Sequence, residues 1–274
     1  MERKYEFTGE TRETLGRTLH RIIAVRDFGN VKAGDKGGWI EKESNLSHEG
    51  NCWVYDEAMV FDDAKVTDNA KVWDHAVVSG TAKVYGYAKL MDNAKVYGNA
   101  KVFGRAGLYE NAQVYENAQV YDMAIVSKCA SVFGNARVFT SADIFGMALV
   151  YGDALVLDKA TVYGNAIVKD KAKVHGNVDL YGNVELCGTA DVSCDRDYIV
   201  FKNWWSSGRY FTWTRSNNLW CVNGILTNGT DLIRDAKLYG EESEREYKRL
   251  VKYVKEIQQA EAIKALQLER NDNN

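Results

Sequence analysis

Proline is missing altogether from the 274 residues of this chain. Because proline normally marks turns and linkers, its absence indicates that the turns are made by another device. A paired cysteine pattern is missing as well. The five cysteines are odd in number, and none of them forms a C-x-x-C pair. This pattern argues against a disulfide framework and against a zinc ribbon, so we expect structural or incidental free thiols.

A strong charge imbalance and long hydrophobic runs are also lacking. The net charge is −3, with 46% hydrophobic and 27% charged residues, an ordinary composition without a global preference for nucleic acid or membrane. No apolar run approaches the roughly 18 residues of a membrane span, and the start, MERKYEFTGETRETLG, has no apolar stretch typical of a signal peptide. We therefore expect a cytoplasmic protein with no membrane partner.

What the sequence does contain is a repeat of six residues. Val, Leu or Ile occupies every sixth position from Val54 to Val192, twenty-four times without an insertion or deletion. Two residues before each of them lies a small residue, which is alanine in all twenty hexads from Ala58 to Ala172. A typical unit, 93–98, reads N-A-K-V-Y-G. The alanine and the aliphatic residue share one strand face, and the glycine with the following asparagine supplies the turn.

A strand this short cannot bury its inner face alone, so successive coils must stack into a solenoid. Alternation of large Val and small Ala suits a narrow triangular bore with three hexads, or 18 residues, per coil. Eight such coils, at about 4.8 Å each, give a prism roughly 38 Å long. The pattern V-Y-G-N-A-K resembles the signature of left-handed parallel β-helix proteins built from hexapeptide repeats, and the left-handed sense is implied by that resemblance alone.

The pattern divides the chain into an N-terminal cap at 1–37, the β-helix at 38–197, an aromatic β-meander at 198–229 and a C-terminal helical segment at 230–274. Residues 19–25 are β-prone and are expected to cover the open edge of the first coil. Ile40 and Leu46 lie two residues out of phase with Val54, which predicts a bulged first coil.

The C-terminal segments carry a different pattern. In the meander, two Ser- and Asn-containing breaks separate three aromatic strand-like runs. Thr230 is the expected N-cap of a short helix, and a long charged helix is expected over 241–269. This helix carries an apolar stripe of Tyr247, Leu250, Val254 and Ile257. It either lies along a face of the prism or pairs with another subunit.

Two segments, HRIIAVRDFGNVKAGDKGGWIEKESNLSHEGNCWVYDEA and FKNWWSSGRYFTWTRSNN, resemble those of YdcK-like hexapeptide-repeat proteins, which are found in bacteria and phages. The resemblance extends over most of the chain and implies the architecture more than a function. By analogy with other left-handed β-helix proteins it also implies a homo-oligomer, with a trimer favoured.

Residues 18 apart share a face, so the outward positions form columns. Three aromatic ladders are expected: Tyr55, Trp73, Tyr109, Phe145, Tyr163 and Tyr181; Phe61, Tyr97, Tyr115, Phe133 and Tyr151; and Tyr85, Phe103, Tyr121 and Phe139. Stacking between coils is the favoured interpretation of these ladders. Lys83, Tyr85, Lys101 and Phe103 interleave basic and aromatic residues and are a secondary candidate binding face. Aspartates near the corners favour a solvated, mixed-charge surface, so nucleic acid is a less favoured partner.

The strongest candidate ligand site is in the predicted meander. It gathers rings and guanidiniums within seventeen residues: Trp204, Trp205, Arg209, Tyr210, Trp213, Arg215 and Trp220. Such a cluster can hold a phosphate, a carboxylate or a flat base. The alternative, which we weigh more heavily, is that these rings form the core of a capping module.

Catalytic chemistry is not indicated. Many left-handed β-helix proteins are acyltransferases with a histidine base and a loop that interrupts the prism, but the array from 54 to 192 has no interruption. The four histidines are interpreted as lone surface residues, with no zinc triad and no cofactor expected. The sequence therefore predicts a non-catalytic binding or scaffold protein that docks a protein partner. One alternative is a protein that sequesters a small anionic or nucleotide-like ligand, for example in phage counter-defence, and another is an acyltransferase.

Overall fold

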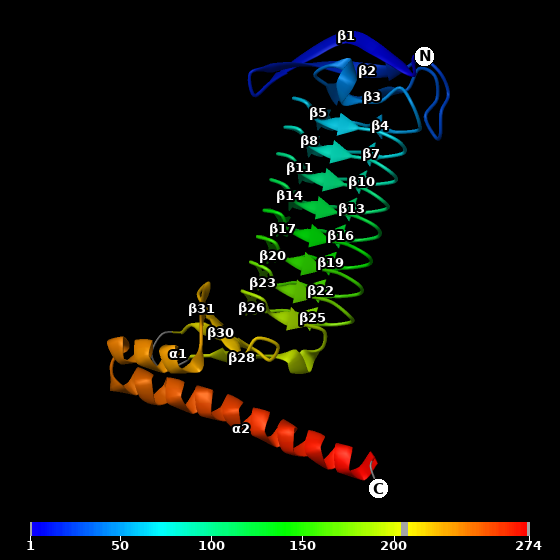
Figure 1. The fold of residues 1–274 in the computed structure, drawn as a ribbon. Helices are drawn as coiled ribbons and strands as arrows, with labels where there is room; N and C mark the ends of the chain where they lie inside the picture. The colour runs from blue at the N-terminus through cyan, green and yellow to red at the C-terminus, as the bar shows by residue number, and fades with distance from the viewer. Residues whose placement is uncertain (1, 204–207, 273–274) are drawn as a thin grey trace.

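The computed structural model describes residues 2–203 and 208–272 of the chain, and Figure 1 shows their arrangement. The hexads wind into a long prism whose strands each contain two residues and end on the inward aliphatic residue. They follow one another at six-residue intervals from β4 (Trp53–Val54) and β5 (Met59–Val60) to β27 (Asp191–Val192). In Figure 1 the near strands point to the right, the chain returns behind them, and successive coils descend from the N-terminal end. A chain that winds in this sense is left-handed, so the predicted left-handed parallel β-helix is confirmed.

Three parallel sheets form the walls of the prism. Strands three apart in the chain are neighbours, as in the order β4, β7 (Lys71–Val72), β10 (Lys89–Leu90). Partners are 18 residues apart, for example Val96 with Val114. The inward alanines and aliphatic residues from Ala58 to Val174 are completely buried and form one continuous core. Each coil therefore buries its apolar face only against its two neighbours, as the repeat predicts.

The corners depend on one residue in the left-handed backbone region, two positions after each inward aliphatic residue from Val54 to Leu186. Glycine occupies many of these positions, for example Gly98 at φ 68°. Asp, Glu, Lys or Thr occupies the others, with φ between 49° and 62° along the prism. Aspartate, the commonest of these, tolerates this region because its short polar side chain can hydrogen-bond locally.

The acidic corner residues bind the next coil. The carboxylate of Asp62 accepts a hydrogen bond from the N–H of Gly80 at 2.9 Å, and that of Asp68 accepts one from Gly86 at 2.9 Å. The same 18-residue contact recurs at Asp92, Glu116, Asp122, Asp158 and Asp170. These aspartates lie at the surface and in addition satisfy backbone donors at the corners, a role that the sequence interpretation did not give them.

The aromatic ladders are confirmed in most places. Neighbouring rings stack with centroids 4.7–5.6 Å apart in the series Phe145, Tyr163, Tyr181, in the series 97–151 and in the series 85–139. Tyr109 differs, because the positions 18 residues before and after it are Met91 and Ser127. Its ring lies instead over Gly107, where an added Cβ would come within 2.5 Å of it.

At the N-terminal end, β1 (Tyr5–Thr14) and β2 (Arg17–Ala24) form a hairpin that pairs through β3 (Lys36–Ile40) with β5. The β-prone run at 19–25 thus lies largely in β2, beside the first coil. Ile40 pairs with Val60, 20 residues later, whereas regular coils have a spacing of 18. The two additional residues lie between Leu46 and Val54, which confirms the bulged first coil.

The C-terminal module consists of a four-stranded antiparallel meander, two helices and a short 3-10 turn at 237–239. The strands are β28 (Tyr198–Lys202), β29 (Tyr210–Thr214), β30 (Leu219–Val222) and β31 (Ile225–Thr227), one more than expected. The helices are α1 (Gly229–Ala236) and α2 (Glu241–Asp272). Asn228, and not Thr230, is the N-cap of α1, because its side chain accepts the N–H groups of Thr230 and Asp231. Figure 1 shows α2 crossing below the prism beside the meander.

Candidate functional site at the C-terminal end of the prism

The meander has two faces, because successive side chains of a strand point to opposite sides. One face carries Phe201, Phe211, Trp213 and Trp220, which pack with Leu232, Ala236, Tyr247, Val251 and Val254 of the helices. Phe211 and Tyr247 meet edge to face with centroids 4.9 Å apart. The apolar stripe of α2 is therefore covered within the same chain, and the long helix does not lie along a prism face.

The other face of the meander is attached to the last coils. Cys221 of β30 forms a disulfide with Cys187, which corrects the expectation that all cysteines are free. The sequence could not show this pairing, because the two residues are 34 positions apart and meet only when the module docks. Glu185 also donates its backbone N–H to the hydroxyl of Thr212 at 3.0 Å.

A nearly buried ion pair adds a third attachment. Lys169 and Glu185 lie 3.2 Å apart on neighbouring coils, with side chains 10% and 17% exposed. Lys169 donates to the carbonyl of Gly224 at 2.8 Å, and Glu185 accepts the N–H of Gly224 at 2.9 Å. The turn between β30 and β31 is thus held by both charged groups, each of which also hydrogen-bonds to the backbone of Gly224.

A pocket of about 540 Å³ lies between the last coil and this meander face. Three tyrosines from different elements line it: Tyr181 follows β25 (Asp179–Leu180), Tyr198 begins β28, and Tyr210 begins β29. Gly182, Asn183, Val184, Asp195 and Val200 complete the described lining. Tyr181 is the last ring of its ladder, 5.6 Å from Tyr163, and is 57% exposed. The prism therefore ends on a ring with a free face at the pocket.

The chemistry of the pocket is aromatic and acidic. Tyr198 donates its hydroxyl to the backbone carbonyl of Asp179 at 3.2 Å. Burial raises the pKa of Tyr198 to about 12, and the carboxylates of Asp195 and Asp179 add to this shift. The phenol is thus a neutral donor at physiological pH. Among the described lining residues Asp195 is the one that carries a charge.

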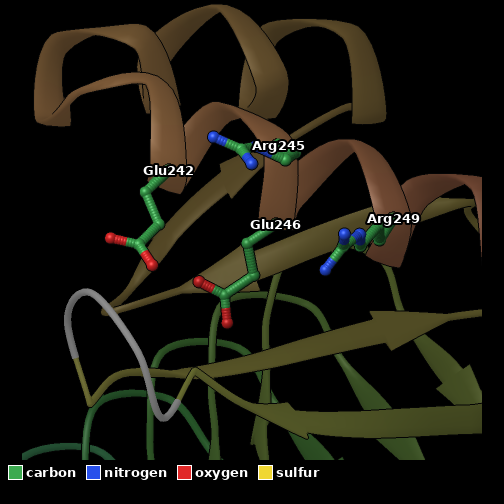
Figure 2. Close-up of a pocket in the computed structure, with 4 residues that line it drawn as sticks. All are labelled: Glu242, Arg245, Glu246 and Arg249. Carbon is green, nitrogen blue, oxygen red and sulfur yellow. The ribbon is translucent and has the colours of Figure 1, made fainter.

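A second pocket, of about 260 Å³, lies against the start of α2. Figure 2 shows the four α2 residues that line it, Glu242, Arg245, Glu246 and Arg249. They are three or four positions apart and so lie on one side of the helix. Two carboxylates and two guanidiniums give this described lining no net charge, so it does not select an anion by charge.

The structure separates the residues of the predicted Arg and Trp cluster. Trp204 and Trp205 lie outside the described residues. Trp213 and Trp220 are 1% and 2% exposed within the module core. Arg215 pairs with Glu261 at 3.1 Å, while the guanidinium of Arg209 lies 5.5 Å from the ring of Tyr239. Tyr210 alone of the described members lines the tyrosine pocket, because the odd-numbered positions of β29 face the helices.

The secondary candidate face is an ordered surface of the prism. Lys83 and Lys101 are paired neighbours on adjacent coils. The rings of Tyr85 and Phe103 stack at 4.8 Å with an interplanar angle of 2°. These contacts are those of the regular ladder, and the role of this face in binding stays a prediction.

Some histidines have partners that the sequence interpretation missed. His48 Nδ1 accepts the backbone N–H of Lys4 at 3.2 Å, and His175 lies between two carboxylates. His175 Nε2 lies 2.8 Å from a carboxylate oxygen of Asp191, and its Nδ1 lies 3.9 Å from one of Asp158. Asp191 is 16 residues later, the same spacing that joins Tyr97 to Gln113. A systematic check of positions 16 apart would therefore have found the pair. Within the described residues, no cluster of three or more His, Cys, Asp and Glu side chains is placed to hold a metal ion.

Comparison with known proteins gives one short match. No family model matches the chain. Over 53 residues it is 47% identical to the uncharacterized acetyltransferase YdcK of Escherichia coli strain K12. Over that stretch this β-helix protein is similar to YdcK. The matched stretch is 19% of this chain and 15% of that relative, so the similarity is limited to a short segment of both proteins. In the part of the chain that the structure describes, no helix has the length and apolar character needed to cross a membrane.

Proposed function

We propose that this protein is a non-catalytic binding protein whose ligand occupies the tyrosine pocket. The pocket itself carries this proposal. It is concave, it has the size of a small-molecule site, and it combines rings with a few polar groups. Its walls come from the last coil and the meander, which are joined by a disulfide and by the Lys169–Glu185 pair. A ligand thus meets a surface that is largely formed before binding.

The occupant is either a free small molecule or a side chain presented by a protein partner. Native mass spectrometry of the purified protein would report a retained molecule together with the number of subunits. A ligand-observed NMR screen with a fragment library would then compare the wild-type protein with Tyr210→Ala. Tyr87→Ala is the matched control, because Tyr87 is 60% exposed on the prism and does not line the pocket.

We expect fragments that bind the wild type and the Tyr87→Ala variant but bind Tyr210→Ala weakly. If no fragment binds, or if Tyr210→Ala retains all binding, the pocket is not the functional site.

Acetyl transfer is the second candidate, because the relative is named an acetyltransferase and His175 is held by Asp191 at 2.8 Å. A carboxylate that orients an imidazole is the arrangement of a general base. The test is acetyl-coenzyme A turnover with a panel of amine and hydroxyl acceptors. Turnover that is lost in His175→Asn would replace the binding proposal with an enzymatic one.

A further inference from the structure

The tyrosine pocket has the composition of a cation site, and this inference rests on the proposed function. Three phenol rings, Tyr181, Tyr198 and Tyr210, line one concave space. Aromatic rings attract cations through their negative faces, and groups of such rings are used to recognise quaternary ammonium groups. Tyr181 has the free face for such a contact, because it ends its ladder and is more than half exposed.

The charges around the rings have the sign that a cation requires. Asp195 lines the pocket, and its described lining contains no lysine or arginine. Asp179 lies beside Tyr198, which donates to its carbonyl, and both carboxylates help to raise the pKa of the Tyr198 phenol. Along the described lining an anion would therefore meet a carboxylate and neutral phenols. Lys202 already lies with its ammonium group 5.4 Å from the ring of Tyr210, so one ring of the pocket accepts a cation within the protein itself.

We propose that the ligand of this pocket carries a methylated ammonium group. A primary ammonium group has three donors that need acceptors, and Asp195 is the only carboxylate among the described lining residues. A trimethylammonium group has no donors and is weakly hydrated, so it loses less on entering an aromatic site. At about 540 Å³ the pocket is larger than this group alone, so the group belongs to a larger molecule.

The probe pair is choline and 3,3-dimethylbutan-1-ol, which has the same shape without the charge. Calorimetry or NMR titration of the full chain should detect choline binding, with the neutral alcohol weaker by roughly 10-fold or more. Tyr181→Ala should weaken choline binding about 3- to 30-fold, and Asp195→Asn roughly 3- to 10-fold. Tyr87→Ala should leave it unchanged. Asp197, two residues further along, is not a suitable control for Asp195. Its carboxylate accepts hydrogen bonds from Ser193 and Cys194, so its replacement would also disturb the local fold.

A second arm separates the two sources of a methylated ammonium group. A peptide with trimethyllysine is compared with the same peptide with unmodified lysine, and both are compared with free choline. Preference for the methylated peptide assigns the group to a protein partner, whereas choline binding without a peptide preference assigns it to a small molecule.

Equal binding of choline and the neutral alcohol, or binding that Asp195→Asn leaves unchanged, would overturn the cation proposal. If fragments from the screen still bind in a Tyr210-dependent way, the binding function stands with a different ligand. If neither probes nor fragments bind, both proposals fail.

Discussion

Two corner glycines with the same backbone conformation allow the close contact between coils to be measured. Gly134 has φ 70° and Gly182 has φ 73°. A Cβ added at Gly134 would lie 2.7 Å from the backbone nitrogen and 2.9 Å from the carbonyl oxygen of Gly152 in the next coil. A Cβ added at Gly182 would meet nothing within 4 Å. The two sites therefore share the conformational cost of a side chain and differ in the steric cost.

The expected values follow from these two costs. Alanine in the left-handed region costs about 1–2 kcal/mol, so Gly182→Ala should lower the free energy of unfolding by about that amount. At Gly134 the contact with rigid backbone adds about 1–3 kcal/mol of overpacking. Gly134→Ala should therefore be clearly the more destabilising of the two variants, by at least about 1 kcal/mol.

Guanidinium denaturation, followed by circular dichroism and tryptophan fluorescence, would measure both variants against the wild type. Gly134→Asp is an internal check, because aspartate at this corner can accept the N–H of Gly152 as Asp62 accepts that of Gly80 at 2.9 Å. It should be milder than Gly134→Ala. Equal losses for Gly134→Ala and Gly182→Ala would refute the argument, since contact between coils would then add nothing to the backbone cost.

Further predictions concern the core, the corners, the ion pair and the pocket. Val96→Asp places a charge in the fully buried bore and should abolish cooperative thermal unfolding, whereas Lys95→Asp at the exposed neighbouring position should not. If Val96→Asp melts like the wild type, the inward assignment is wrong. Asp68→Ala should lower the free energy of unfolding, measured by denaturation, by about 1–2 kcal/mol, and Asp68→Gly should lower it less because only glycine relieves the positive φ of 59°. A larger loss for Asp68→Gly would contradict this account. Lys169→Met leaves the nearly buried carboxylate of Glu185 without its ion-pair partner and should lower the free energy of unfolding by about 3–5 kcal/mol. Adding Glu185→Gln should restore part of this loss, and no recovery in the double variant would argue against the pairing. The pKa of Tyr198 is raised to about 12, so the contribution of its neutral phenol to stability is complete below pH 10 and is lost as the pH rises through about 12. Titration of phenolate absorbance should show a late step in the wild type that is missing in Tyr198→Phe, and the lack of such a step in the wild type would refute the burial argument.

The prism could be predicted from the sequence because its geometry depends on a local pattern. The six-residue spacing sets which residues face inward, and all the predicted inward positions from Ala58 to Val174 are buried. The corners were predicted only in part. Glycine was recognised as a turn residue. The hydrogen bond from the N–H of Gly80 to the carboxylate of Asp62 links different coils, and it can be predicted only when the spacing of 18 is applied to side-chain acceptors as well as to strands.

The C-terminal module shows where such reasoning ends. The concentration of arginine and aromatic residues in this segment indicated a single site. Strand alternation instead places Trp213 and Tyr210 on opposite faces of the meander. That separation could have been predicted from the period of two. The pocket itself could not, because Tyr181, Tyr198 and Tyr210 meet only through the docking of the meander on the last coil. The disulfide between Cys187 and Cys221 depends on the same docking.

The hexad also determines how the length of this molecule can change. Removing 18 residues from the middle of the prism would shorten it by about 4.8 Å and return every face to its former alignment. Removing six residues would instead advance the chain by one wall, so the docking surface formed by Lys169 and Glu185 would face a different direction relative to the hairpin of β1 and β2. A change by whole coils therefore alters the distance between the two ends at constant relative orientation, whereas a change by single hexads alters the orientation as well.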